Sequence, residues 1–208
     1  MSQPNPTMQD PRRADFDAEA RKLFALLNLP ADGDARGSAS SYENLNAVWK
    51  HPTGGGSVYI GNITASSSKA ELDRHNITHI VNCQDTTTAN TFERDPHFHY
   101  FRFPVSHWWR QGLNTHDDVL KFFAPVFQFC DDATAQGHSV LIHCLAGAHR
   151  AGTTGVAFVM HATGLEADKA LAAVKARRPI VNPIAGLQDL LLKFEAAQAA
   201  KAAKAGRR

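Results

Sequence analysis

The segment VLIHCLAGAHRAGTTG, residues 140–155, decides the predicted fold. Its opening residues form an apolar run that is typical of a strand buried on both faces of a sheet. Cys144 ends this run, five residues follow, and Arg150 opens a segment of helical composition. Gly147 permits a backbone conformation that most residues avoid, so the intervening loop can curl around a tetrahedral anion. The segment therefore predicts a buried strand, a tight loop and a helix, in that order.

This arrangement fits a binding site for a phosphate monoester. A loop at a helix N-terminus directs several backbone N–H groups inward, and the helix dipole adds positive potential. Arg150 can return its planar guanidinium to two phosphate oxygens. The same field favours the thiolate of Cys144, which would attack phosphorus to form a phosphocysteine that water then hydrolyses. A cysteine at a strand end is often only a small buried hydrophobe, but the strand, the glycine and the helix start favour catalysis here.

The rest of the chain alternates strand and helix patterns. Period-2 or β-branched runs predict strands, and apolar residues at helical spacing predict helices. The predicted strands are 57–62, 78–84, 98–105 and 138–144, and the predicted helices are 14–29, 66–76, 116–135, 150–162, 165–179 and 186–206. Ser66 or Ser67 would cap the second helix. The pattern indicates an α/β fold with a central mixed sheet of four or five strands, mostly parallel near Cys144, with helices on both faces.

Bulk composition limits the classes of function. The 208 residues fit one domain with short additions, and 22 Lys and Arg against 20 Asp and Glu predict no nucleic-acid partner. Three cysteines, Cys83, Cys130 and Cys144, make an odd count that argues against a disulfide framework. The sequence carries no secretory signal core and no apolar stretch of about 18 residues, so we expect no membrane span. A cytoplasmic or nuclear location is the resulting prediction.

The segment HCLAGAHRAG (143–152) resembles the signature loop of the cysteine-based protein tyrosine phosphatase superfamily, and its surroundings resemble the dual-specificity branch. The likeness covers roughly residues 57–197, and four further segments carry it: VYIGN (58–62), ITHIVN (77–82), FRFPVS (101–106) and RRPIVNPIAGLQDLLLKFE (177–195). On this basis the chain divides into a phosphatase catalytic domain at 57–197, an N-terminal extension with one helix at 1–56, and a basic C-terminal tail at 198–208. We expect the extension to pack against the domain.

The resemblance implies hydrolysis of phosphotyrosine and of phosphoserine or phosphothreonine in a phosphorylated protein partner. It implies that Cys144 is the nucleophile and that His143 helps to hold the cysteine loop. It implies no metal and no cofactor, and the scattered histidines of the sequence offer no metal cluster either. The phosphate-binding residues that it implies are those of the loop and its arginine: Leu145, Ala146, Gly147, Ala148, His149 and Arg150.

Two positions depart from the family pattern. The family usually has a serine or threonine directly after the loop arginine, where its hydroxyl helps the cysteine to leave, and this chain has Ala151. Thr153 and Thr154 cannot simply replace it, because each helical step turns a side chain by about 100°. Slow hydrolysis of the phosphoenzyme is therefore a hypothesis.

The general acid is the second departure, because His107 stands where the family has an aspartate. Histidine is a competent acid near neutral pH, so His107 is our preferred candidate. Asp117 or Asp118 could also reach the cleft through an insertion, although both suit helix capping better. A protein without any acid would favour substrates with good leaving groups. In the same loop, Trp108 and Trp109 could stack on a phosphotyrosine ring or simply pack on the domain.

Three rival interpretations remain open. A pseudophosphatase would bind phosphorylated partners without hydrolysing them, and Ala151 and the missing aspartate favour that idea. A non-protein phosphate such as an inositol phosphate could be the substrate, although LAGAH carries no lysine for a highly charged ligand. A sulfurtransferase also uses a cysteine loop ahead of a helix, but it would leave the resemblance of the neighbouring segments unexplained.

Cys83 and Cys130 are interpreted as core residues, and Cys83 is the better partner for a disulfide to Cys144 under oxidation.

Overall fold

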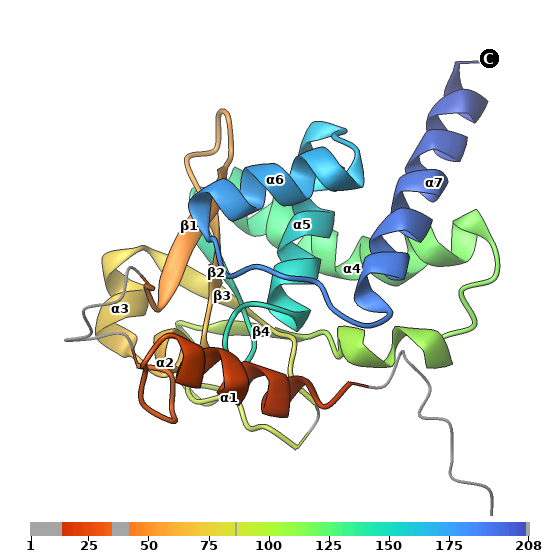
Figure 1. Ribbon diagram of the computed structural model, residues 1–208. Coiled ribbons are helices and arrows are strands. Elements are labelled where there is room, and N and C mark those ends of the chain that lie inside the picture. Colours follow the sequence, from red (N-terminus) through yellow and green to blue (C-terminus); the bar gives the residue numbers. More distant parts are fainter. Residues whose placement is uncertain (1–13, 35–41, 86, 207–208) are drawn as a thin grey trace, which may run out of the picture.

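The computed structural model describes residues 14–34, 42–85 and 87–206, so parts of the predicted N-terminal extension and C-terminal tail lie outside the described residues. A five-stranded sheet with the order β1-β2-β5-β3-β4 forms the centre of the fold. β1 pairs antiparallel with β2, and the other neighbours are parallel (Figure 1). The strands are β1 (Leu45–Lys50), β2 (Ser57–Gly61), β3 (Ile77–Asn82), β4 (His99–Arg102) and β5 (Ser139–His143). The predicted mixed α/β sheet is therefore confirmed.

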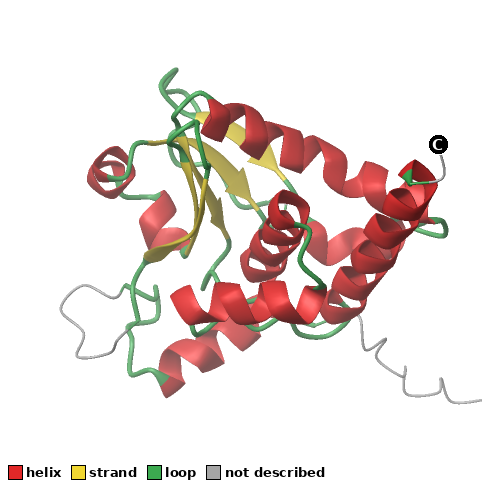
Figure 2. Ribbon diagram, turned by 90° about the horizontal axis from the view of Figure 1, so that it is seen from above, coloured by secondary structure: helices red, strands yellow, loops and turns green. Residues whose placement is uncertain are grey.

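Helices cover both faces of this sheet, as predicted (Figure 2). The larger layer consists of α4 (His116–Ala135), α5 (Arg150–Thr163), α6 (Ala167–Arg177) and α7 (Leu187–Ala205), and the short α2 (Ile63–Ser66) and α3 (Lys69–Arg74) lie on the other face. β5 serves both layers, because Val140 and Ile142 join the large core while Leu141 joins the small one. All five of its residues are buried, which explains its unbroken apolar pattern.

The boundaries of several elements differ from the sequence prediction. β1 was not predicted, because an edge strand with one exposed face lacks the continuous apolar run of β5. α2 was also missed, and the N-cap of α3 is Ser68 rather than Ser66 or Ser67. A helix of four residues such as α2 is too short to show a helical period in the sequence.

The long helix α4 has the predicted bounds. It begins with a capping box in which the Thr115 hydroxyl accepts from the Asp118 N–H and the Asp118 carboxylate accepts from the Thr115 N–H. The helix is followed by Gly137 at φ 87°, a left-handed conformation that glycine adopts without strain. None of the helices in the described ranges is long and apolar enough to span a bilayer.

The N-terminal helix α1 (Phe16–Leu26) lies against the loop that follows β5 (Figure 1). Asp15 caps it by accepting hydrogen bonds from the N–H groups of Asp17 and Ala18. Its buried side chains include Ala20 and Phe24, which form a small core with loop residues Ala146 and Ala148. α1 therefore forms part of the surroundings of the predicted catalytic loop.

Candidate active site

The loop between β5 and α5 brings Cys144 and Arg150 together beneath the surface. Cys144 directly follows β5, Arg150 is the first residue of α5, and both are buried. Gly147 has φ 64°, as the sequence led us to expect. A Cβ atom there would lie 2.4 Å from the Gly61 carbonyl oxygen, so no larger residue fits. The loop is therefore fixed both by its own backbone and by contact with β2.

The five carbonyl groups of residues 145–149 in the loop accept hydrogen bonds from its surroundings. The donors are Ile63 N–H to Leu145, Arg178 Nη2 to Ala146, Arg178 Nε to Gly147, Asn182 N–H to Ala148, and Thr153 N–H to His149. The C=O and N–H of a planar trans peptide point in opposite directions. Outward carbonyls therefore leave the N–H groups of residues 146–150 pointing inward, and among the described residues none of these N–H groups donates a hydrogen bond. The loop has the form of an anion cradle.

Arg178 is a positioning residue that the sequence reasoning missed. Its side chain is buried, and it donates to two loop carbonyls, to the Glu43 carbonyl and to the Asn46 amide oxygen. Burial lowers the pKa of this arginine from its ordinary value, against the opposing effect of Tyr42. Arg178 is the C-cap residue of α6, and no local sequence pattern connects it with carbonyl groups 31 and 32 positions away.

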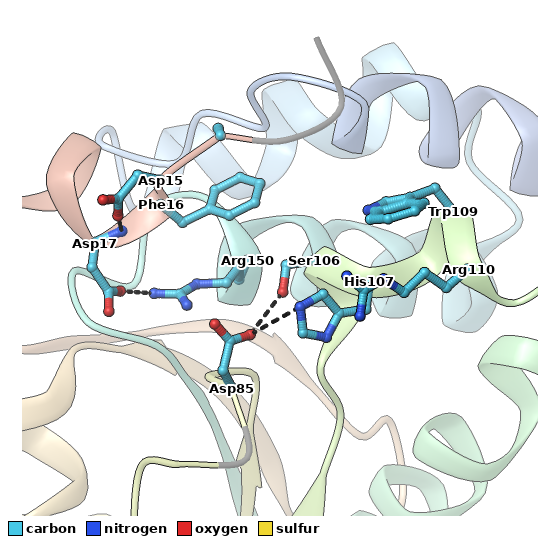
Figure 3. Close-up of a pocket in the computed structure, with 10 residues that line it drawn as sticks. Asp15, Phe16, Asp17, Asp85, Ser106, His107, Trp109, Arg110 and Arg150 are labelled. Carbon is cyan, nitrogen blue, oxygen red and sulfur yellow. Dashed lines mark hydrogen bonds and ion pairs between the residues drawn. The ribbon is translucent and has the colours of Figure 1, made fainter. Parts of the chain in front are cut away.

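Arg150 lies under α1, and Figure 3 shows its guanidinium extended toward Asp17. The Asp17 carboxylate accepts a hydrogen bond from Nη2, and the Phe16 ring centroid lies 5.6 Å from the guanidinium carbon. The buried Nε has no hydrogen-bond partner among the described residues. The pKa of Arg150 is raised, since Cys144, Asp17 and Asp85 together outweigh the effect of burial. Arg150 thus has one donor in use and another available for a ligand.

His107 lies in the 3-10 helix η1 (Val105–Arg110) and faces Asp85, which follows β3. Its Nε2 is 3.7 Å from the Asp85 carboxylate, and the Ser106 hydroxyl donates to the same oxygen at 3.1 Å. These three side chains lie beside Arg150 (Figure 3). Sequence reasoning named His107 but missed Asp85. The signal available was its position at the carboxyl end of a buried parallel strand, next to the strand that leads to Cys144.

A cavity of about 370 Å³ lies beside Arg150, Asp85 and His107, and its lining does not include Cys144 or residues 145–149. η1 provides Ser106, His107, Trp109 and Arg110, while α1 and the residues before it provide Ala14, Asp15, Phe16 and Asp17; Asp85 and Arg150 complete the lining. Trp109 therefore lies at the site, whereas Trp108 is buried in the main core. Asp117 and Asp118 do not line the cavity, and the capping box accounts for Asp118.

His143, the last residue of β5, and His149 in the loop are both buried. Burial, together with Arg102 and Arg150, lowers the pKa of His143 to about 3, so its ring is neutral. Its Nδ1 has no hydrogen-bond partner among the residues described, so the structure gives no loop-holding bond from this atom. His149 Nδ1 lies 2.7 Å from the Asn182 carbonyl, and burial lowers the pKa of its ring as well. His149 is therefore a buried loop residue whose Nδ1 contacts the segment before α7.

The helix start after Arg150 lacks a free hydroxyl. Ala151 is fully buried, the Thr153 hydroxyl donates to the His149 carbonyl, and the Thr154 hydroxyl donates to the Arg150 carbonyl. Both threonines thus bond within their own helix turn.

Cys83 and Cys130 are fully buried core residues, and burial raises the pKa of Cys83 to about 12. Within the described ranges no three His, Cys, Asp or Glu side chains are arranged to hold a metal ion.

Comparison with known proteins gives a consistent family assignment. A family model described as the catalytic domain of dual specificity phosphatases matches residues 58–197. The dual specificity protein phosphatase Mpk3 of Drosophila melanogaster is 32% identical over 140 residues, which cover 67% of this chain and 32% of that protein. Dual specificity protein phosphatase 1 of Arabidopsis thaliana is 36% identical over 138 residues, which cover 64% of this chain and 65% of that protein. The chain spans about a third of the length of Mpk3.

Solved structures show the same fold. A crystal structure of a human DUSP28 variant superposes with a TM-score of 0.60 and 26% identity, over 76% of this chain and 97% of that one. The crystal structure of DUSP15 gives a TM-score of 0.52 and 28% identity, over 73% and 92% of the two chains. The family match begins at residue 58, so α1 and its pocket residues lie outside it.

Proposed function

The chain belongs to the dual-specificity phosphatase family, and on that premise we propose that it removes phosphate from phosphotyrosine and from phosphoserine or phosphothreonine of proteins. The reaction would proceed through a phosphocysteine on Cys144. The observation that supports this proposal is the loop itself: the carbonyls of residues 145–149 all accept hydrogen bonds from surrounding groups, whereas the N–H groups of residues 146–150 donate none among the described residues. Five inward N–H groups at a helix start suit the oxygens of a phosphate.

Substrate binding would use the loop N–H groups of residues 146–150 together with Arg150. The available Nε and the Nη2 of Arg150 form one edge of a planar fork that matches two oxygens of a phosphoryl group. Nη2 forms an ion pair with Asp17, so bidentate binding of phosphate by Arg150 requires the Asp17 carboxylate to move away. The helix dipole of α5 adds to the attraction.

In the first chemical step the Cys144 thiolate attacks phosphorus, an S–P bond forms and the P–O bond to the leaving group breaks. His107 gives its proton to the departing oxygen, and we assign it as the general acid. The Asp85 carboxylate lies 3.7 Å from Nε2 and would orient the imidazole ring for this transfer. Electrostatic stabilisation of the transferring phosphoryl group comes from Arg150 and the loop N–H groups.

In the second step a water molecule attacks phosphorus, the S–P bond breaks, and phosphate and the thiolate are released. His107, now neutral, accepts a proton from this water. Ala151 offers no hydroxyl to the leaving sulfur, and the hydroxyls of Thr153 and Thr154 are bonded to carbonyl groups. We therefore propose that the second step is slow relative to the first.

Phosphopeptide hydrolysis tests the proposal directly. Phosphate release is measured from peptides that carry phosphotyrosine, phosphoserine or phosphothreonine, with Cys144→Ser as the blank. We expect release with the wild type and none with the variant. Tight binding of the peptides without any phosphate release would show that the chain is a pseudophosphatase rather than an enzyme. Release from a soluble inositol phosphate but from no peptide would overturn the assignment of a protein substrate.

A further inference from the structure

The first turn of α1 forms a wall of the cavity beside Arg150. Asp15, Phe16 and Asp17 line the cavity together with Asp85, His107 and Arg150. Figure 3 shows the Asp17 carboxylate directed at the guanidinium of Arg150. In this ion pair the Arg150 side chain is 3% exposed and the Asp17 side chain is 39% exposed. A carboxylate that can be reached from the cavity therefore occupies a donor that the phosphate needs.

A phosphate dianion cannot bind Arg150 Nη2 unless the Asp17 carboxylate moves away from it. The cavity is lined by three carboxylates, Asp15, Asp17 and Asp85, and by two guanidinium groups, Arg110 and Arg150. Asp15 is engaged at the helix N-terminus, and Arg110 lies over the Trp109 ring at 4.7 Å. Arg150 is then the cation for which phosphate and Asp17 compete. Like charges at short range destabilise each other strongly in a partly buried site.

We propose that Asp17 is a specificity-determining residue of this pocket. Its carboxylate holds Arg150 until phosphate displaces it, and it then faces the part of the substrate next to the phosphate. The displaced carboxylate is best compensated by a positive charge, so the preferred substrates carry an arginine or lysine beside the phosphorylated residue. Substrates with acidic neighbours are disfavoured, because they add negative charge to a wall that already carries it. This inference rests on the proposed phosphatase site and names its substrate class.

The attachment of α1 makes the proposal testable by substitution. The helix is held by Ala20 and Phe24, which pack on Ala146 and Ala148, and by the Asp15 cap. None of these contacts uses the Asp17 side chain. Replacing Asp17 therefore changes the charge facing Arg150 without releasing the helix. Asp17→Glu keeps the charge, and Asp73→Asn on the exposed surface of α3 makes the same change in net charge away from the cavity.

The experiment measures three quantities for wild type, Asp17→Asn, Asp17→Glu and Asp73→Asn. They are KM for an aryl phosphate, the inhibition constant of inorganic phosphate, and kcat/KM for phosphotyrosine peptides with arginine or glutamate beside the phosphotyrosine. For Asp17→Asn we expect KM and the inhibition constant to fall about tenfold, equivalent to ~1.4 kcal/mol, and the arginine-over-glutamate preference to fall by a similar factor. Asp73→Asn should stay within about twofold of wild type in all three quantities, a difference of ~0.4 kcal/mol. Asp17→Glu should retain the arginine-over-glutamate preference, because it keeps the negative charge.

Unchanged constants in Asp17→Asn, or an equal change in Asp73→Asn, would overturn the inference. A binding measurement separates this failure from a failure of the proposed function. Calorimetry measures the affinity of inorganic phosphate for Cys144→Ser with and without Asp17→Asn, and it needs no turnover. If the double variant binds phosphate more tightly but the wild type shows no turnover, Asp17 competes with phosphate for Arg150 and the proposed phosphatase activity is wrong. If the wild type turns over but Asp17→Asn leaves the phosphate affinity unchanged, the phosphatase activity is supported and the role of Asp17 is rejected.

Discussion

Gly147→Ala would test the geometry of the phosphate loop with the addition of one methyl group. The residue has φ 64°, and its new Cβ would lie 2.4 Å from the Gly61 carbonyl oxygen and 2.8 Å from Arg178 Nη2. The Gly61 oxygen belongs to the backbone of β2 and cannot rotate away. The loop itself must therefore move, and with it the N–H groups that we propose bind phosphate.

The magnitude has two parts. The left-handed backbone conformation costs an alanine ~1–2 kcal/mol relative to glycine. Relief of the contact with Gly61 adds the cost of overpacking, ~1–3 kcal/mol. We therefore expect a loss of ~2–5 kcal/mol in the free energy of unfolding. A displacement of the loop by about 1 Å would lower kcat/KM roughly a hundredfold, because transition-state stabilisation depends on position.

Gly164→Ala is the matched control. Gly164 follows α5 at φ 73°, and a Cβ there would meet no atom within 4 Å. This variant should lose only the ~1–2 kcal/mol of the backbone term and keep its full kcat/KM. Urea denaturation and steady-state hydrolysis of an aryl phosphate measure both quantities. Equal losses of stability in the two variants, or full activity in Gly147→Ala, would refute the reasoning about loop geometry.

Three further predictions concern other parts of the molecule. Ala151→Ser should speed hydrolysis of the phosphoenzyme about tenfold, within the range of single catalytic groups, and a burst followed by an unchanged steady-state rate would contradict it. His107→Gln should lower kcat/KM ~100-fold for alkyl phosphates, which need an acid, and far less for an aryl phosphate with a good leaving group; equal losses for both would remove His107 from this role. Burial beside His99 and His138 lowers the pKa of His79 to about 4. Unfolded chains therefore bind more protons between about pH 6.5 and 4, and stability falls as pH falls through that window. The pKa shift of His79 corresponds to ~3 kcal/mol in the free energy of unfolding, and solvent exposure reduces this to ~1–2 kcal/mol. His79→Gln should remove this part of the pH dependence, as measured by urea titrations at pH 7 and 4.5.

Sequence reasoning succeeded where the relevant residues are neighbours in the chain. The segment from β5 through Arg150 is contiguous, so its strand, loop and helix could be predicted from local patterns. α4 was predicted with its observed bounds because a cap, an amphipathic repeat and a glycine mark it. The signals of these elements come from the burial and backbone conformation of the residues themselves.

The walls of the pocket could not be predicted in this way. Asp17 is 133 positions from Arg150, and nothing in the composition of α1 indicates that its first turn reaches the phosphate loop. Asp85 lies in a short loop and becomes significant only through its contacts with Ser106 and His107. Arg178 likewise acts through carbonyl groups 31 and 32 positions away. These roles follow from the topology of the sheet and the packing of α1, which one sequence does not specify.

The central claim, a phosphocysteine at Cys144, is tested most directly by rapid mixing with an aryl phosphate followed by a denaturing quench and mass spectrometry. We predict one added phosphoryl group per chain, located on the peptide that contains Cys144, and formed in parallel with a burst of phenol. Cys144→Ser should show neither the burst nor the label. Sustained turnover in Cys144→Ser, or a phosphoryl group on any other residue, would contradict the account.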